Sequence, residues 1–201
     1  MTQSELITPD QVPLWIPGTL TMDSASLPWD GMTLKGYEYT AQDVEIPLMR
    51  DYMIVRYWNT PAEMCRRSKS PWESAPVGPG KVSILTRAEK SEWRWNGPLR
   101  VSHLYLEHEA LNNVACDVFE RDVKDVEIRD LLSAENSALS NLIGRLEWEL
   151  TNEEVGGRLY ADLLRNQACI EVLRKYASVS YKENTGYGRF SPTQRRILLE
   201  Y

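Results

Sequence analysis

The chain has 201 residues, of which 42% are hydrophobic and 26% charged, and its formal net charge is −6 at pH 7. This composition is ordinary for a globular protein that buries one sizeable core. An acidic balance argues against a nucleic-acid-binding surface within these residues, because contacts to phosphate need clustered lysine and arginine. Three widely separated cysteines fit neither a disulfide framework nor a zinc site. With no leader sequence and no long apolar run, the sequence predicts a cytoplasmic protein without a membrane span.

The first two thirds of the chain alternate short apolar runs with turn residues. Residues 53–58 are rich in β-branched and aromatic side chains and predict a strand, and residues 82–86 predict another after a Gly-Pro-Gly turn. Residues 93–106 predict a hairpin around an Asn-Gly turn. Short strands broken by glycine and proline indicate a mainly β fold, an antiparallel sandwich or barrel over residues 21–132.

Two segments flank these strands. Residues 1–20 contain Trp15 and three prolines and predict an N-terminal arm, which is a plausible moving part. The pattern of residues 117–132 does not distinguish a helix from a strand. One interpretation places a short helix over residues 108–116 and a strand over residues 123–131 that returns to the barrel.

From residue 133 the apolar residues recur at helical spacing. The first predicted helix has Ser133 as its N-cap and carries an apolar stripe of Leu139, Leu142, Ile143, Leu146 and Leu150. After Gly156-Gly157, a second helix is predicted over residues 158–177, with a stripe of Leu159, Leu163, Ile170, Leu173 and Ala177. Two amphipathic helices in succession predict an antiparallel pair over residues 133–177. This pair buries its stripes against the barrel or against a second copy of the chain.

The C-terminal residues change character again. Residues 178–190 are polar, contain two glycines and predict a linker. Ser191-Pro192 then provides an N-cap followed by proline at the first helical position, and the predicted helix continues to Tyr201. A linker followed by one capped, unfinished helix is typical of a truncated domain.

Three segments together resemble the AraC/XylS family of transcription regulators. Residues 190–201, FSPTQRRILLEY, resemble the opening of the first helix of the family's DNA-binding domain, which contains two helix-turn-helix units. Residues 169–177, CIEVLRKYA, are similar to the family's linking helix. Residues 77–87, VGPGKVSILTR, and the Trp-Arg-Trp at 93–95 are similar to its cupin-like sensor domains. The order of these segments carries the resemblance, which covers most of the chain past residue 30.

This resemblance implies a fold and a function. The fold is a cupin-like (jelly-roll) β-barrel followed by an antiparallel helix pair. The function is that of the effector-sensing and dimerisation region of a bacterial regulator that controls transcription in response to a small molecule. The resemblance implies a homodimer formed through the helices, and DNA binding only through a C-terminal domain that begins at residues 191–201. We predict the dimer contact at Leu159, Leu163, Ile170 and Leu173.

Six residues are candidates for ligand binding: Tyr52, Arg56, Trp58, Trp93, Trp95 and His103. By strand alternation the first three share a face, where an arginine among aromatic rings either clamps a carboxylate-bearing effector or lies at the surface. Trp93 and Trp95 share a face and either stack on an effector or plug the barrel. His103 lies on one strand face with Val101 and Tyr105, as a metal ligand or as a hydrogen-bonded strand residue.

The alternative function is that of a metal-dependent cupin enzyme, an isomerase or a dioxygenase. Such sites hold a metal with two or three histidines and a carboxylate, whereas this chain has only His103 and His108, with Glu107 at a poor spacing. A third possibility is a structural dimerisation module without a ligand. The sequence therefore predicts no metal, no cofactor and no catalytic residue, and a protein that is not an enzyme.

Overall fold

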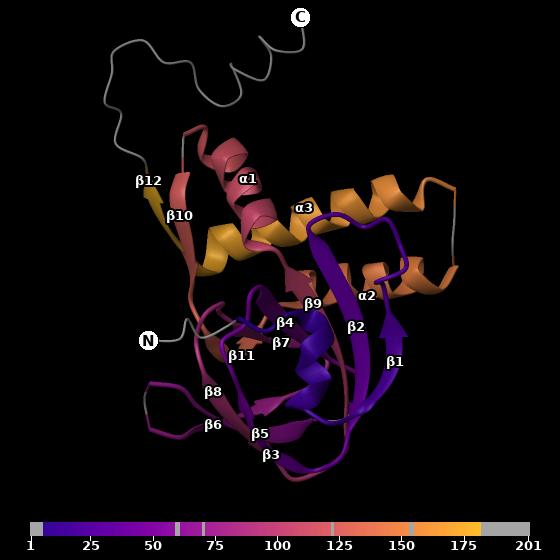
Figure 1. The fold of residues 1–201 in the computed structure, drawn as a ribbon, viewed down its shortest axis with the longest axis vertical. Helices are drawn as coiled ribbons and strands as arrows, with labels where there is room; N and C mark the ends of the chain where they lie inside the picture. The colour runs from indigo at the N-terminus through magenta and orange to yellow at the C-terminus, as the bar shows by residue number, and fades with distance from the viewer. Residues whose placement is uncertain (1–5, 59–60, 70, 122, 153–154, 182–201) are drawn as a thin grey trace, which may run out of the picture.

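The structure is a computed structural model that describes residues 6–58, 61–69, 71–121, 123–152 and 155–181. Two antiparallel sheets form the lower part of the molecule and three helices lie above them (Figure 1). Residues 178–181 of the predicted linker form part of a strand instead, and the rest of that linker and the helix predicted from Ser191 lie outside the described residues. No helix of the described part of the chain is long and apolar enough to cross a membrane.

The larger sheet has six strands, and each neighbouring pair is antiparallel. In spatial order they are β1 (Thr19–Asp23), β2 (Met32–Tyr39), β9 (Leu99–Leu106), β4 (Tyr52–Tyr57), β7 (Lys81–Leu85) and β11 (Leu131–Glu135). The smaller sheet has four strands, in the order β3 (Gln42–Ile46), β8 (Ser91–Trp95), β5 (Ala62–Arg67) and β6 (Glu73–Val77). The mainly β prediction is confirmed.

The hairpin predicted over residues 93–106 is wrong. Both strands form, but β8 pairs with β3 and β5 in the smaller sheet, while β9 pairs with β2 and β4 in the larger one. Each strand has both edges occupied by other partners, so neither edge is free for the other strand. The Asn-Gly segment therefore carries the chain from one sheet to the other.

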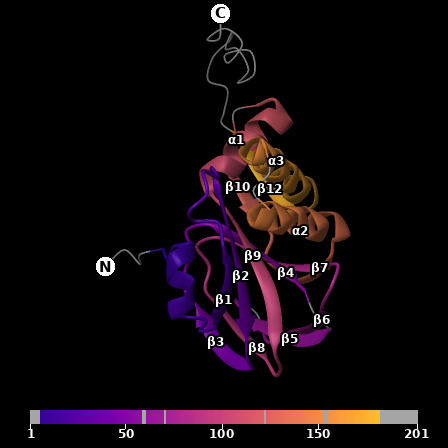
Figure 2. The same cartoon turned by 90° about the vertical axis from the view of Figure 1, so that its right-hand side faces the viewer.

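The helices α1 (His108–Phe119), α2 (Ser137–Asn152) and α3 (Gly157–Tyr176) lie on the same side of the larger sheet (Figure 2). Beside them β10 (Val123–Ile128) pairs with β12 (Ala177–Tyr181) in a separate two-stranded sheet. The prediction that residues 123–131 return to the barrel as one strand is therefore wrong. The chain turns after β10, and the strand that returns to pair with β7 is β11.

The predicted helix pair is present, but two of its details differ. Ser133 lies in β11, and the N-cap of α2 is Asn136, whose Oδ1 accepts a hydrogen bond from the Leu139 N–H at 3.1 Å. In α3 the buried face carries Ala161, Leu164, Ala168, Cys169, Val172 and Leu173. Leu159 and Leu163 of the predicted stripe are exposed instead, whereas Leu173 is buried as predicted.

Two hydrophobic cores lie on opposite faces of the larger sheet. Tyr52 and Ile54 of β4 pack toward the helices, and Met53, Val55 and Tyr57 pack into the space between the two sheets. This division follows from strand geometry, since successive side chains point to opposite faces. The short helix η1 (Pro9–Leu14) and the residues after it pack against the second core through Val12 and Ile16.

Candidate functional site

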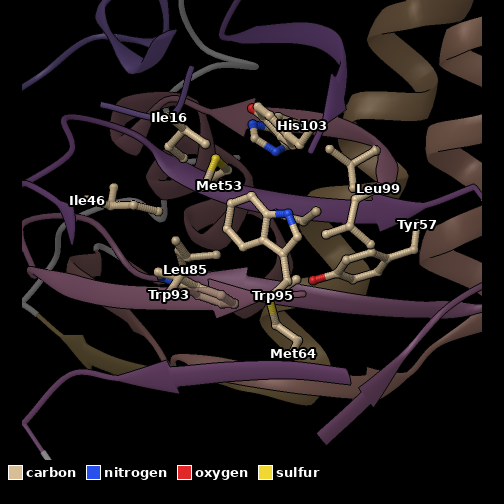
Figure 3. Close-up of a pocket in the computed structure, with 13 residues that line it drawn as sticks. Ile16, Ile46, Met53, Tyr57, Met64, Leu85, Trp93, Trp95, Leu99 and His103 are labelled. Atoms are coloured by element: carbon tan, nitrogen blue, oxygen red, sulfur yellow. The ribbon is translucent and has the colours of Figure 1, made fainter. Parts of the chain in front are cut away.

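An apolar cavity of about 40 Å³ lies between the two sheets (Figure 3). Strands β2, β4, β7 and β9 line one side, strands β3, β5 and β8 line the other, and Ile16 reaches it from the N-terminal segment. A water molecule needs about 10–15 Å³ of such space, so the volume suits a few small groups. It is well below the roughly 150 Å³ of an apolar cavity that accepts benzene.

Three of the six predicted ligand residues, Trp93, Trp95 and His103, line this cavity. Figure 3 shows the rings of Trp95 and Tyr57 and the imidazole of His103 turned toward the same space. The two tryptophans come from β8 and the histidine from β9, so the sheets supply aromatic side chains from opposite walls. The sequence prediction thus selected residues from both walls without the strand pairing that brings them together.

The other three predicted ligand residues lie on the opposite face of the larger sheet. Nη1 of Arg56 is 2.7 and 3.0 Å from the two carboxylate oxygens of Glu147 in α2. The guanidinium lies 4.7 Å from the ring centroid of Trp58, whose Nε1 donates to Ser102 Oγ at 2.7 Å. Burial raises the pKa of Glu147, and hydrogen bonds and the charge of Arg56 partly offset this increase. Arg56 and Trp58 thus connect α2 to the sheet and do not reach the cavity.

Tyr52 also points away from the cavity. Its hydroxyl donates to the carbonyl oxygen of Val126 at 2.7 Å and lies 3.1 Å from Nδ1 of His108. Because that hydroxyl proton is already donated, His108 Nδ1 carries a proton and donates to the tyrosine oxygen. These bonds connect β4 to α1 and β10, and the two histidines of the chain lie on opposite sides of the sheet.

The polar groups around the cavity are almost all paired within the protein. Nε1 of Trp93 donates to Ser91 Oγ at 2.8 Å, Nε1 of Trp95 donates to the Thr40 carbonyl oxygen at 2.6 Å, and Tyr57 Oη bonds Ser83 Oγ. Among the described residues, Tyr39 Oη has no hydrogen-bond partner, although only 5% of the residue is exposed. Sequence reasoning missed Tyr39, and the alternation of Tyr37 and Tyr39 on one strand face was the signal for it.

His103 is uncharged in this site. Burial lowers its imidazole pKa to about 3, and its Nδ1 lies 3.0 Å from Tyr105 Oη. A neutral imidazole can still donate one hydrogen bond and accept another. In the part of the chain that the structure describes, no group of three or more His, Cys, Asp or Glu side chains is placed to hold a metal ion.

The N-terminal segment covers one side of the cavity. Gly18 lies so close to the ring of Tyr39 that a Cβ at this position would collide with it. Before it, Asp10 of η1 forms an ion pair of 2.9 Å with the buried Lys35, which also pairs with Asp23 at 2.5 Å. Backbone contact with Tyr39, the side chain of Ile16 and the Asp10–Lys35 pair therefore hold this segment against the barrel.

Comparisons with known proteins support the fold. The sequence matches no family model and no curated protein. The structure is similar to that of the AraC-like transcriptional activator CuxR, with a TM-score of 0.53 and 11% identity, over 85% of this chain and 60% of that chain. It is also similar to an apo form of ToxT from Vibrio cholerae, with a TM-score of 0.52 and 14% identity, over 78% of this chain and 60% of that one. A second ToxT structure gives a TM-score of 0.51 at 13% identity.

These similarities confirm the structural part of the sequence prediction. The chain has a mainly β fold with C-terminal helices, shared with AraC-like transcription regulators. At such low identities the shared property is the fold. The chain spans about 60% of the length of the matched structures.

Proposed function

We propose that these residues form the effector-sensing and dimerising region of an AraC-type transcription regulator, and that the cavity between the sheets takes a small molecule. The observation that carries the proposal is an apolar cavity, covered by the N-terminal segment, inside a fold shared with AraC-like regulators. The division into an arm (residues 1–20), a sensing barrel and a helical element is part of this proposal, with the barrel extended from the predicted residue 132 to Glu135, where β11 ends. So is a cytoplasmic location.

Strand β4 provides a physical route from the cavity to the helices. Val55 and Tyr57 line the cavity, and Arg56 between them is held by Glu147 of α2. We infer that a ligand that displaces Val55 and Tyr57 also shifts the backbone of β4, because closely packed side chains have little room to move alone. Because the Arg56–Glu147 pair is largely buried, α2 would follow that movement.

The exposed face of α3 supports the proposed homodimer. Leu159 is 68% exposed and Leu163 is 54% exposed, one helical turn apart on the same face. Ile170 is only partly buried, whereas Leu173 packs into the chain's own core and is therefore removed from the proposed contact. Leu159 and Leu163 are neighbours on this face, and an apolar patch of neighbouring side chains favours a surface that pairs with another protein.

DNA binding is proposed for a domain that would follow these residues, in line with their acidic balance. A mobility-shift assay tests this part with the promoter region upstream of the gene's own operon. Specific retardation by the 201 residues at physiological salt would contradict the proposed division of roles. Retardation only by a longer product of the gene would support it.

The cavity is tested by methyl NMR of the chain titrated with toluene. We expect shifts at Ile46, Leu85 and Leu99, which line the cavity, and none at Ile143 in the helix-side core. Ile16→Ala should enlarge the cavity and tighten toluene binding, because this side chain comes from the covering segment. If the cavity methyl groups do not respond in either protein, the proposal of a ligand site fails.

A further inference from the structure

We propose that the ligand of this cavity is an uncharged, mainly apolar molecule of about one aromatic ring, with a single polar group that hydrogen-bonds Tyr39 Oη. This inference rests on the proposed function and adds the chemical class of the effector. Three observations carry it: the absence of charge in the lining, the pairing of the other polar groups, and the aromatic walls around Tyr39.

The described lining contains no ionised side chain. It consists of aliphatic and sulfur-containing residues, tryptophans, tyrosines and a histidine whose buried imidazole is neutral. An ionised ligand would lose its hydration without gaining a counter-charge, and the loss of hydration of an unpaired buried ion is far larger than that of a neutral group. The nearby Lys35 does not line the cavity, and two aspartates already neutralise it.

The hydrogen-bonding capacity of the walls is nearly exhausted. The indole donors of both tryptophans and the hydroxyl of Tyr57 have protein partners, and one nitrogen of His103 lies beside Tyr105 Oη. Tyr39 lines the cavity, and its Oη is buried and has no hydrogen-bond partner among the described residues. A buried hydroxyl without a partner is costly, so this atom favours a ligand that offers one donor or acceptor.

The rings around Tyr39 favour a flat ligand. Its ring centroid lies 5.8 Å from that of Trp95 and 6.0 Å from that of His103. Aromatic rings prefer such tilted or offset contacts with one another, and another ring inserted here would make several of them. At about 40 Å³ the space is too small for a ring as it stands, and we infer that binding displaces Ile16 outward because it comes from the covering segment.

Three probes of nearly equal shape separate the contributions: toluene, p-cresol and benzoate. They are titrated into the intact chain, with the cavity methyl groups as the readout. We expect p-cresol to bind about 3- to 10-fold more tightly than toluene, the range of one net neutral hydrogen bond. Benzoate should bind at least about 10-fold more weakly than p-cresol, because it is ionised at pH 7.

Tyr39→Phe should weaken p-cresol binding by about 3- to 10-fold and leave toluene within about twofold. The matched control is Tyr37→Phe, since Tyr37 is buried and stacks on Tyr39 at 5.5 Å but does not line the cavity. This control should leave the preference for p-cresol unchanged. Thermal unfolding of both variants checks that each still folds.

The outcomes separate this inference from the proposed function. If the probes bind but benzoate binds most tightly, or if Tyr39→Phe leaves p-cresol binding unchanged, the inferred ligand class is wrong while the ligand site stands. An equal response to p-cresol and toluene in the unmodified chain also overturns it, because Tyr39 would then be satisfied by buried water. If no probe binds either the unmodified chain or Ile16→Ala, both proposals fail.

Discussion

Asn136 connects the barrel to both long helices, and its loss should be measurable. Its Oδ1 caps α2 at the Leu139 N–H, its Nδ2 donates to Tyr176 Oη of α3 at 3.0 Å, and its own N–H bonds the Gly80 carbonyl oxygen. Alanine keeps the backbone bond and removes the other two. Loss of an N-cap costs about 1 kcal/mol, and loss of a partly buried hydrogen bond costs about 1 kcal/mol more.

Asn136→Ala should therefore lower the free energy of unfolding by about 2 kcal/mol in urea titrations. For a chain of this length, that decrease corresponds to a melting temperature about 4–8 °C lower. Tyr176→Phe removes only the second bond and should cost about 1 kcal/mol. The double variant should show a coupling energy of about 1 kcal/mol, because the shared bond can be lost only once.

Asn136→Ser is the control, since a hydroxyl still caps the helix but is too short to reach Tyr176. We expect it to resemble Tyr176→Phe and not the alanine variant. A loss below about 0.5 kcal/mol for Asn136→Ala would refute the reasoning, because that value is the scatter expected of an ordinary surface substitution. Strict additivity in the double variant would refute the contact between Asn136 and Tyr176.

Three further predictions concern the cavity and the dimer. Burial holds the His103 pKa near 3 against 6.5 in the unfolded chain, so its contribution to stability is present above pH 6.5 and is lost as the pH falls. From pH 6.5 to 5 the unmodified chain should lose about 1.5 kcal/mol more than His103→Gln, as measured by urea unfolding. Leu163→Asp should convert the proposed dimer to a folded monomer in sedimentation, whereas Leu14→Asp, at another exposed leucine, should not; a dimeric Leu163→Asp would place the interface elsewhere. Gly18→Ala should cost about 1–3 kcal/mol by overpacking, and Gly97→Ala, with open space around it, should stay within about 0.5 kcal/mol; equal losses would contradict the close packing at Gly18.

Local patterns in the sequence predicted most of the elements. The apolar and β-branched run at 53–58 became β4, and the helical spacing of Leu139, Ile143 and Leu146 became the buried face of α2. These features depend on the period of one segment, which neighbouring residues specify. The same local logic failed in part for α3, where Leu173 of the predicted stripe is buried but Leu159 and Leu163 are exposed, and Ala161 and Ala168 lie on the buried face.

The candidate site was only half predictable, for a physical reason. Alternation correctly grouped Tyr52 with Arg56, and Trp93 with Trp95, on shared strand faces. Alternation cannot say which face of a strand borders the cavity when both faces are buried, as they are in β4 and β9. Strand pairing decides that, and it depends on contacts between residues far apart in the chain. Alternation could have grouped Tyr39 with Tyr37 on one strand face, but the missing hydrogen-bond partner of Tyr39 is visible only in the three-dimensional arrangement.

The burial of the larger sheet on both faces has a mechanical consequence. The effector that we propose for the cavity would contact Val55 and Tyr57, and the intervening Arg56 is bound to Glu147 on the other face. Closely packed interiors do not deform continuously, so a displaced strand must repack on both sides at once. Ligand-free and ligand-bound packing would then differ in the position of α2, and α3 is packed against α2. In our proposal the exposed leucines of α3 form the dimer contact, so a change between the two sheets would reach the partner subunit through a single strand and two helices.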